Sequence, residues 1–513
     1  MTVRRKPLAT IALAIGVALA LVPSASMALA DDAVPGIFID STVHELPAPA
    51  VALASDGRAL VVYQDNEPDA AADFDCTASD DCVTYGVVVG ADGITVGEPF
   101  VVSGDVPFDY YYTAPQVMWN DDLGEWLVLM TSYRSDPNSL FAQRVGSDGE
   151  LVGALVELPS QTLTSPDDRS TLIETSMSNH VLPNATWSPA LDAYLVTWYA
   201  DGNTVGSRVA VGYFMNADLT SYDDVEAGFQ LAPVTGVNYS IRQDFNAETG
   251  EWAVAYSMST GKDVFVMGVR FDGTTLDLST PMEVVDGGTV QGMWPQGGLT
   301  YVASQGAWLV SFGGEQGTSP DQTYDVYGRY VSDDLFGAPA VSESIAMTSH
   351  GTSSQGNPIQ EGRSHEIKYD SVTGLVYGAG TVVSYDADID RDVFAATAWS
   401  FDPATDTFSD VVELFAPSGG TPPVGQAEQS SRARISVQSG GVAVTWQNWL
   451  GGDYQEPTEV RFALLQEVVV EEEAPELAET GAAQSAGIAG VALALMVAGG
   501  ALIVARRRQQ ATT

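Results

Sequence analysis

The sequence predicts an all-β fold, a seven-bladed β-propeller, for the ectodomain at 31–467, and three observations lead to this prediction. No long helical pattern occurs there, and short stretches rich in Val, Tyr, Trp and Thr alternate with turns rich in Gly, Asp, Asn and Ser. One strand motif recurs seven times. The strands around it recur as well, so that each unit holds four strands and spans about 56 to 68 residues.

The recurring motif is a central strand that follows a turn. Its seven copies are GRALVVYQD (57–65), GEWLVLMTS (124–132), DAYLVTWYA (192–200), GEWAVAYSM (250–258), GAWLVSFGG (306–314), the longer and irregular GLVYGAGTVVSYD (374–386), and GGVAVTWQN (440–448). A shorter strand precedes the motif, a third strand follows it, and an outer strand such as EPFVVSG or PMEVVDG ends the unit. Seven copies predict seven blades, with six or eight left open.

The two ends of the predicted propeller complete one blade between them. The last unit, which ends near EVRFALLQEV (459–468), lacks an outer strand of its own. The segment GIFIDSTVHELP (36–47) has the hydrophobic pattern and the Pro ending of the missing strand. We expect it to pair with the final three strands, because an open propeller would expose two unpaired sheet edges.

The units resemble the propeller repeats of secreted bacterial proteins, which carry a pattern of the form ylVvW…d.yg.r…dG…g. This resemblance covers most of residues 37–467 and implies the fold, not an activity. Large aromatic residues recur with the same period. Recurrence in every blade favours packing between blades over a row of sugar-stacking rings. These residues are Trp126, Tyr194, Trp252 and Trp308.

The first thirty residues have the pattern of a secretory signal peptide (1–30). Basic residues at 4–6 precede an apolar stretch at 8–22, and the small-x-small pattern Ala-Leu-Ala ends at Ala30. Cleavage after Ala30 leaves Asp31 as the mature N-terminus.

The C-terminus has the pattern of a membrane-spanning helix at 486–505. This run contains no charge and no proline, and as a helix its twenty residues measure about 30 Å, the thickness of the hydrocarbon core of a bilayer. Three arginines begin the tail at 506–513, which indicates that this end stays cytoplasmic. A short acidic linker, VVVEEEAPE at 468–476, separates the last strand from the segment in front of the span.

A pentapeptide lies between this linker and the span. Its residues are Leu477, Ala478, Glu479, Thr480 and Gly481. Leu-Ala-x-Thr-Gly, a hydrophobic helix and a basic tail, in this order, resemble the cell-wall sorting signal of Gram-positive surface proteins, in the variant typical of high-GC actinobacteria. The resemblance implies that a sortase cuts between Thr480 and Gly481, forms a thioester with the Thr carbonyl, and passes it to an amine of the peptidoglycan precursor. An ordinary single-span protein with a chance match is the alternative.

The mature protein is strongly acidic. The whole chain has 21 basic and 67 acidic residues, a net charge of −46. The two removable ends hold six basic residues and no acidic ones, so that 15 basic residues remain against 67 acidic ones, a net charge of −52. Such a field excludes nucleic acid and anionic lipid surfaces as partners. Solubility outside the cell explains it most simply, and binding of cations or a cationic ligand is the alternative.

Two features of the sequence suggest local chemistry. Cys76 and Cys82 are the two cysteines, and we expect a loop disulfide between them in an oxidising compartment. The loop YDADIDRD alternates four carboxylates, a pattern that can bind calcium or simply be a solvated turn. These carboxylates are Asp386, Asp388, Asp390 and Asp392. No other cofactor is indicated.

The sequence holds no recognised catalytic motif. Gly-x-Ser-x-Gly, His-Glu-x-x-His, a phosphate loop and a dinucleotide fingerprint are all missing. The stretch ASDGRAL (54–60) only partly matches the Asp box of sialidases, and it does not recur. These absences favour a protein that is not an enzyme.

A set of hydrogen-bond donors lies just before the innermost strands, where propeller loops meet around the axis. They are Tyr112, His180, Arg242, His365 and Arg434. Guanidinium groups near the axis favour an anionic or polyhydroxylated ligand; simple pairing with neighbouring carboxylates is the alternative. We therefore expect a wall-anchored surface protein that binds an extracellular glycan or protein. An exported hydrolase or lyase acting on polysaccharide, and a structural surface-layer component, are the alternatives.

Overall fold

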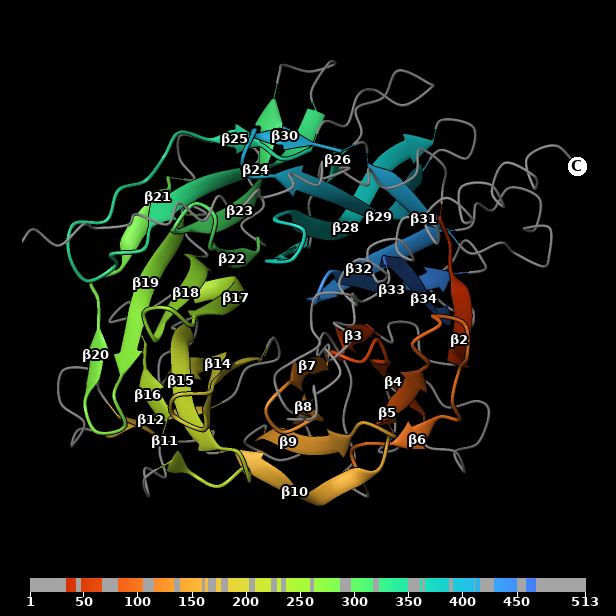
Figure 1. Ribbon diagram of the computed structural model, residues 1–513, viewed down its shortest axis with the longest axis horizontal. Coiled ribbons are helices and arrows are strands. Elements are labelled where there is room, and N and C mark those ends of the chain that lie inside the picture. The colour runs from red at the N-terminus through yellow and green to blue at the C-terminus, as the bar shows by residue number, and fades with distance from the viewer. Residues whose placement is uncertain are drawn as a thin grey trace, which may run out of the picture. The chain divides into compact units, whose positions relative to one another are not determined.

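Seven four-stranded antiparallel blades form a β-propeller, which confirms the predicted fold class and blade number (Figure 1). The computed structural model describes residues 34–42, 48–66, 82–104, 115–132, 139–158, 162–164, 172–176, 183–202, 208–222, 228–231, 237–258, 263–286, 297–316, 323–348, 360–361, 365–386, 391–409, 411–415, 429–449 and 458–466. The chain divides into two compact units, and all described residues lie in the first, Met1–Val470. No helix among them is long and apolar enough to cross a membrane. The predicted span at 486–505 lies outside them.

The first three blades follow one another along the chain, and each is built from the axis outward. Blade 1 contains β3 (Ala50–Leu53), β4 (Ala59–Asn66), β5 (Cys82–Val89) and β6 (Phe100–Val101). Blade 2 contains β7 (Gln116–Asn120), β8 (Glu125–Ser132), β9 (Ser139–Gly146) and β10 (Leu151–Leu158). Blade 3 contains β13 (Asn184–Ser188), β14 (Ala193–Gly202), β15 (Arg208–Asn216) and β16 (Gly228–Gln230), with an added hairpin of β11 (Thr162–Thr164) and β12 (Leu172–Ser176).

The next three blades carry small additions to the four-stranded plan. Blade 4 contains β17 (Val237–Asn246), β18 (Glu251–Met258), β19 (Val264–Phe271) and two outer pieces, β20 (Leu276–Leu278) and β21 (Met282–Val285). Blade 5 contains β22 (Leu299–Val302), β23 (Ala307–Gln316), β24 (Thr323–Ser332) and β25 (Ile345–Ala346). Blade 6 contains β27 (Glu366–Tyr369), β28 (Val376–Asp386), β29 (Arg391–Asp402), β30 (Thr407–Phe408) and β31 (Val412–Phe415). The short β26 (Gln360–Glu361) pairs with both β24 and β28 and so links blades 5 and 6.

The N-terminal strand closes the ring, as predicted. Blade 7 contains β32 (Gln429–Gln438), β33 (Gly441–Trp449) and β34 (Thr458–Gln466), and its outer strand is β2 (Ile37–Thr42), which pairs antiparallel with β34. The sequence did not indicate that β1 (Val34–Pro35) would also pair, in parallel, with β31 of blade 6. Between β1 and β2, a Cβ atom on Gly36 would lie 2.2 Å from the Trp446 ring, so only glycine lets the chain pass there.

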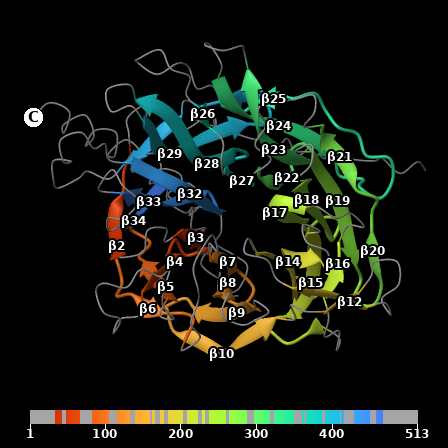
Figure 2. The ribbon, with the colours of Figure 1, turned by 180° about the vertical axis from the view of Figure 1, so that it is seen from behind.

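The innermost strands form a closed ring around the axis. Each of β3, β7, β13, β17, β22, β27 and β32 contacts the innermost strands of its two neighbouring blades. Figure 2 shows this arrangement from behind. The side chains of these seven strands are therefore the ones available to a site on the axis.

The hydrophobic core consists of seven clusters, one between each pair of neighbouring blades. Trp126, Tyr194, Trp252 and Trp308 each lie in one of them and are at most 1% exposed. The predicted packing role is confirmed, and these rings are not available to stack on a sugar.

Blade 6 explains the irregular copy of the repeat. Val376 stands where blades 2 to 5 carry the large aromatic residue, and Trp399 of the next strand supplies a ring to the cluster between blades 5 and 6. That ring lies against Gly378, where a Cβ atom would be 2.2 Å from it. Gly378 therefore makes room for the Trp399 ring.

Many aspartates of this acidic chain shape hairpin turns. Asp92, Asp218 and Asp272 lie in turns before outer strands, and each accepts a backbone hydrogen bond from the residue two positions later. Hydrogen bonds from Thr95 hold the pKa of Asp92 at about 2, and similar bonds lower the pKa of the other two carboxyls. Part of the negative charge therefore supports the fold itself.

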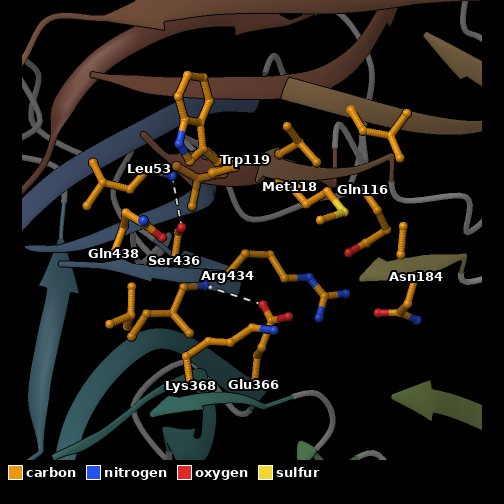
Figure 3. A pocket seen from close by; sticks show the side chains of 18 of the residues that line it. Leu53, Gln116, Met118, Trp119, Asn184, Glu366, Lys368, Arg434, Ser436 and Gln438 are labelled. Carbon is orange, nitrogen blue, oxygen red and sulfur yellow. Dashed lines mark hydrogen bonds between the residues drawn. The ribbon is translucent and has the colours of Figure 1, made fainter. Parts of the chain in front are cut away.

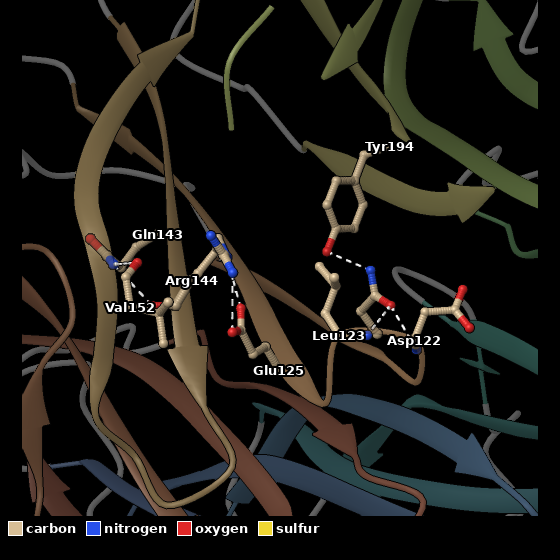
Figure 4. Close-up of polar contacts among 8 residues, drawn as sticks. Asp122, Leu123, Glu125, Gln143, Arg144, Val152 and Tyr194 are labelled. Carbon is tan, nitrogen blue, oxygen red and sulfur yellow. Dashed lines mark hydrogen bonds and ion pairs between the residues drawn. The ribbon is translucent and has the colours of Figure 1, made fainter. Parts of the chain in front are cut away.

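Tyr194 connects blades 2 and 3. Asn120 Nδ2 donates to the Tyr194 hydroxyl over 2.7 Å, while Asn120 Oδ1 accepts from the backbone amides of Asp122 and Leu123 (Figure 4). Burial raises the pKa of Tyr194 to about 12. A phenol with a raised pKa contributes stability that is fully present below pH 10, its ordinary pKa, and is lost as the pH rises towards 12.

We expect Tyr194→Phe to change the alkaline stability profile. The variant loses the hydrogen bond from Asn120, about 0.5–1.5 kcal/mol, at neutral pH. The parent loses about 2–3 kcal/mol of unfolding free energy between pH 10 and 12, because its buried phenol resists ionisation in the folded state. The phenylalanine variant has no phenol and does not lose this contribution. Melting temperatures measured from pH 7 to 11.5 should therefore converge at the alkaline end. A constant difference between parent and variant across this range would contradict the assignment.

Candidate functional site

Equivalent positions of the innermost strands form a tier around the axis. The pairing of each innermost strand with the second strand of its blade defines this position: it lies three residues before the pair near the turn that is equivalent to Trp119↔Trp126 of blade 2. In blade order these residues are Ala50, Gln116, Asn184, Arg242, Gly298, Glu366 and Arg434. Side chains alternate along a strand, so the residues two positions later form a second tier on the same face. These are Ala52, Met118, Thr186, Asp244, Thr300, Lys368 and Ser436.

A cavity of about 280 Å³ lies between these innermost strands. Its two sides differ in character. Blades 1 and 2 line it with apolar groups, among them Ala52, Leu53 and Met118, whereas blades 6 and 7 line it with Glu366, Lys368 and Arg434. Figure 3 shows the Arg434 side chain extending across the cavity toward Gln116 and Asn184. We call this space the axial cavity.

Two arginines at the axis are buried without an ion pair. Arg242 is 7% exposed and Arg434 is 9% exposed. Among the described residues, ion pairs are formed by Arg58, Arg144, Arg270 and Arg461, each with a nearby carboxylate, and neither Arg242 nor Arg434 forms one. A buried cation without a carboxylate partner is costly to the fold. Neither arginine therefore forms a direct ion pair in the described part of the chain, although the charge of Glu366 acts on both.

The charges at the axis act on one another. Burial and the nearby charge of Arg434 lower the pKa of Arg242 to about 10, so Arg242 stays protonated at neutral pH. Burial alone would raise the pKa of Glu366, but the charges of Arg434, Lys368 and Arg242 hold it below its usual value. Glu366 Oε2 also accepts a long hydrogen bond, 3.4 Å, from the Ile435 amide. Glu366 is therefore a carboxylate at neutral pH.

Several buried donors near the axis have no hydrogen-bond partner in the described part of the chain. They include Gln116 Nε2, Thr186 Oγ1 and Arg242 Nε. Arg242 Nη1 donates to the carbonyl of Ile241 over 3.2 Å, and Asn184 Nδ2 donates to the same carbonyl over 2.7 Å. Unsatisfied buried donors are rare in folded proteins, and a ligand is one of the groups that can satisfy them.

Asp244 lines the cavity but its oxygens are engaged. Oδ1 accepts from the Phe245 amide over 2.9 Å. Oδ2 accepts from the Tyr301 amide over 2.7 Å and from Thr300 Oγ1 over 3.1 Å. This carboxylate holds blade 4 to blade 5 and has little capacity left for a ligand.

The predicted ligand-face residues have different outcomes. Arg242 and Arg434 lie within the innermost strands β17 and β32, not in loops before them, and their charges interact. His365 is fully buried, and its Nε2 lies 2.9 Å from Ser311 Oγ of blade 5, so it does not line the cavity. Tyr112 and His180 lie outside the described residues.

Sequence reasoning missed the other polar residues of the cavity, among them Gln116, Glu366 and Lys368. A residue-by-residue alignment of the repeats could have found the first two. Gln116 precedes Trp126 by ten positions, as Arg242 precedes Trp252 and Glu366 precedes Val376.

The predicted metal and disulfide positions lie partly outside the described residues. Asp386 pairs with Arg391 and Tyr385 with Asp392 in the backbone ladder of the β28–β29 hairpin, whereas Asp388 and Asp390 lie outside the described residues. Cys82 is the first residue of β5, but the structure describes only its backbone. Cys76 lies outside the described residues. Within the described part, Asp263, Glu283 and Asp286 gather on blade 4 with ligand atoms within 4.8 Å of one another. Exposed acidic groups are common in so acidic a chain, so we assign no function to this group.

Comparison with known proteins identifies likeness of fold. No family model matches the sequence, and neither does any curated protein. A protein of Lactobacillus plantarum is similar over 74% of this chain and 88% of its own, with 11% identity and a TM-score of 0.36. The NanB sialidase of Streptococcus pneumoniae is similar over 84% and 70%, with 9% identity and a TM-score of 0.39. The endosialidase of phage phi92 is similar over 88% and 71%, with 9% identity and a TM-score of 0.39. Likeness this distant carries no argument about activity or ligand.

Proposed function

We propose that this protein is an exported, wall-anchored binding protein whose propeller takes a glycan into the axial cavity. The observation that carries this proposal is the pair of buried arginines, Arg242 and Arg434, which lie on innermost strands and form no ion pair among the described residues. A concave site shared by several elements, with an apolar wall and a few polar groups, is the usual form of a ligand site. The cavity has this form, with apolar groups on blades 1 and 2 and charged groups on blades 6 and 7.

Anchoring at the cell wall is the second part of the proposal and rests on the sequence. The signal-peptide pattern, the Leu477–Gly481 pentapeptide, the apolar run and the arginine tail stand in the order that sorting requires. The strand β34 ends at Gln466, and the acidic linker at 468–476 spans about 30 Å at most when extended. So short a tether suits a binding site that works close to the wall.

Hydrolysis of a polysaccharide is the rival function, because two carboxylates line the cavity. Glycoside hydrolysis needs a carboxylic acid that stays protonated, which requires a raised pKa. The pKa of Glu366 is lowered instead, and both oxygens of Asp244 accept hydrogen bonds. These two groups are suited to binding and not to proton donation.

A variant that fills the cavity tests the proposed function. Met118→Trp adds an indole to the apolar wall, and we expect it to weaken glycan binding at least ten-fold. Leu151→Trp is the matched control, because Leu151 lies on the outer strand of the same blade and is 43% exposed. The measurement is a glycan array on the ectodomain, followed by calorimetric titration of the hits and a hydrolysis screen on the same glycans. Equal binding by both variants would place the site elsewhere, and turnover of a bound glycan would favour the rival.

A further inference from the structure

We propose that the axial cavity selects a sugar unit carrying a single carboxylate, which Arg434 binds, and that Glu366 rejects ligands with two negative charges. This inference rests on the proposed function and adds the class of ligand. Three features of the cavity carry it: a guanidinium that forms no ion pair among the described residues, the balance of charge around it, and the size and apolar wall of the space.

The first feature is the environment of Arg434. Its side chain extends across the cavity toward Gln116 and Asn184 (Figure 3). Both of these residues have neutral amide side chains, so they do not neutralise the positive charge of the guanidinium. The planar guanidinium offers two parallel N–H groups that match the two oxygens of a carboxylate. A ligand carboxylate would therefore supply the partner that, among the described residues, the chain does not supply.

The second feature is the charge balance. The charged residues that line the cavity are two cations, Lys368 and Arg434, and two carboxylates, Glu366 and Asp244. Arg242 does not line the cavity, but it is near enough for its charge to interact with those of Arg434 and Glu366, and it adds a third cation to the group. Three positive charges against two negative ones leave one positive charge at the axis. One negative charge on the ligand neutralises it. A second negative charge would meet Glu366 between the innermost strands, where like charges repel more strongly than they do in bulk water.

The third feature is the room available. A cavity of about 280 Å³ is at the small end of the range of ligand pockets, which is about 300–1,000 Å³. This is space for one sugar ring and not for a long segment of chain. Met118 and Ala52 form an apolar wall on which the C–H face of such a ring can pack.

The test compares matched sugars in calorimetric titrations of the whole ectodomain. Carboxylated probes are glucuronic, galacturonic and N-acetylneuraminic acids, neutral probes are glucose, galactose and N-acetylglucosamine, and the dianionic probe is glucose 6-phosphate. We expect at least one carboxylated probe to bind ten-fold or more tighter than every neutral one, and glucose 6-phosphate to bind weakly. Arg434→Gln should abolish the preference for the acid, and Arg434→Lys should keep only part of it, because lysine retains the charge without the paired N–H groups.

Glu366→Gln tests the rejection of dianions separately. This variant keeps the shape of the side chain and removes its charge, so the affinity for glucose 6-phosphate should rise at least ten-fold relative to that for the carboxylated probe. Arg58→Gln is the control for the loss of an arginine, because Arg58 pairs with Asp56 at the surface and does not line the cavity. Melting temperatures show whether each variant folds.

The outcomes separate this inference from the proposed function. Equal binding of neutral and carboxylated probes, both lost in Met118→Trp, would leave the axial site standing and overturn charge selection. Carboxylate binding that survives Arg434→Gln in a folded protein would overturn the role of Arg434. An unchanged ratio in Glu366→Gln would overturn the role of Glu366. If no probe binds the parent, the inference fails whatever larger glycan the array identifies.

Discussion

Deletion of residues 31–47 is expected to destabilise the propeller severely and to cause aggregation. The deletion removes β2, the outer strand of blade 7, and exposes the edge of β34 from Thr458 to Phe462. It also removes Ile39, which is 5% exposed and packs in the cluster between blades 7 and 1. Burial of this side chain alone stabilises the fold by about 1.5–3 kcal/mol, and an unpaired strand edge is a template for association between molecules.

Two neighbouring substitutions and a peptide give this experiment its controls. Ile39→Ser should reproduce part of the loss in melting temperature, whereas Phe38→Ser should have a small effect, because Phe38 is 46% exposed. A synthetic peptide of residues 31–47, added to the deleted protein, should restore part of the stability by strand addition. Unchanged melting temperature and a monodisperse profile in size-exclusion chromatography after the deletion would show that β2 does not close the ring.

Thr480→Ala is expected to change the location of the protein from the wall to the membrane. The resemblance to the sorting signal makes the Thr480 carbonyl the acyl group that the sortase transfers. Without this threonine the precursor should keep its apolar run in the bilayer and become extractable with detergent. The measurement is fractionation of cells with hot detergent, followed by treatment of the residue with wall hydrolase.

Glu479→Gln is the matched control for Thr480→Ala. It changes the neighbouring residue at the position that the Leu-Ala-x-Thr-Gly pattern leaves variable, so the protein should stay attached to the wall. Release of the Thr480→Ala variant by wall hydrolase alone would mean that the pentapeptide does not direct sorting. Complete extraction of the parent protein by detergent would also show that the pentapeptide does not direct sorting.

The fold could be predicted from the sequence because each blade repeats the same local pattern. Alternating apolar residues and Asp- or Gly-containing turns specify four strands, and a blade buries its faces only against its neighbours. The central strands at 124–132 and 250–258 correspond to β8 and β18 within a residue. Closure could be predicted for a related reason, since the last unit was one strand short and 36–47 had the matching pattern. What the repeat did not contain, such as the parallel pairing of β1 with β31, could not be predicted.

The predicted ligand face remains a prediction. Arg242 and Arg434 were chosen because loops before innermost strands meet at the axis, but the structure places both within innermost strands, β17 and β32. The same reasoning failed for His365, whose side chain turns between blades 5 and 6 toward Ser311. One position along a strand decides whether a side chain faces the axis or a neighbouring blade, and a boundary estimated from sequence is less precise than that.

The sequence by itself determined the order of the parts: a leader pattern, seven repeats, an acidic linker, a pentapeptide that resembles a sorting motif, and an apolar run. It also predicted seven blades and the packing role of the recurring aromatic residues, because both follow from local periodicity, and the structure confirmed both. Only the tertiary structure decided which side chains share the axial cavity. Glu366 and Gln116 are 250 positions apart, and nothing local in the chain relates them. They line the same cavity because closing the ring brings equivalent positions of separate blades together, and the charge balance there is a property of the ring as a whole.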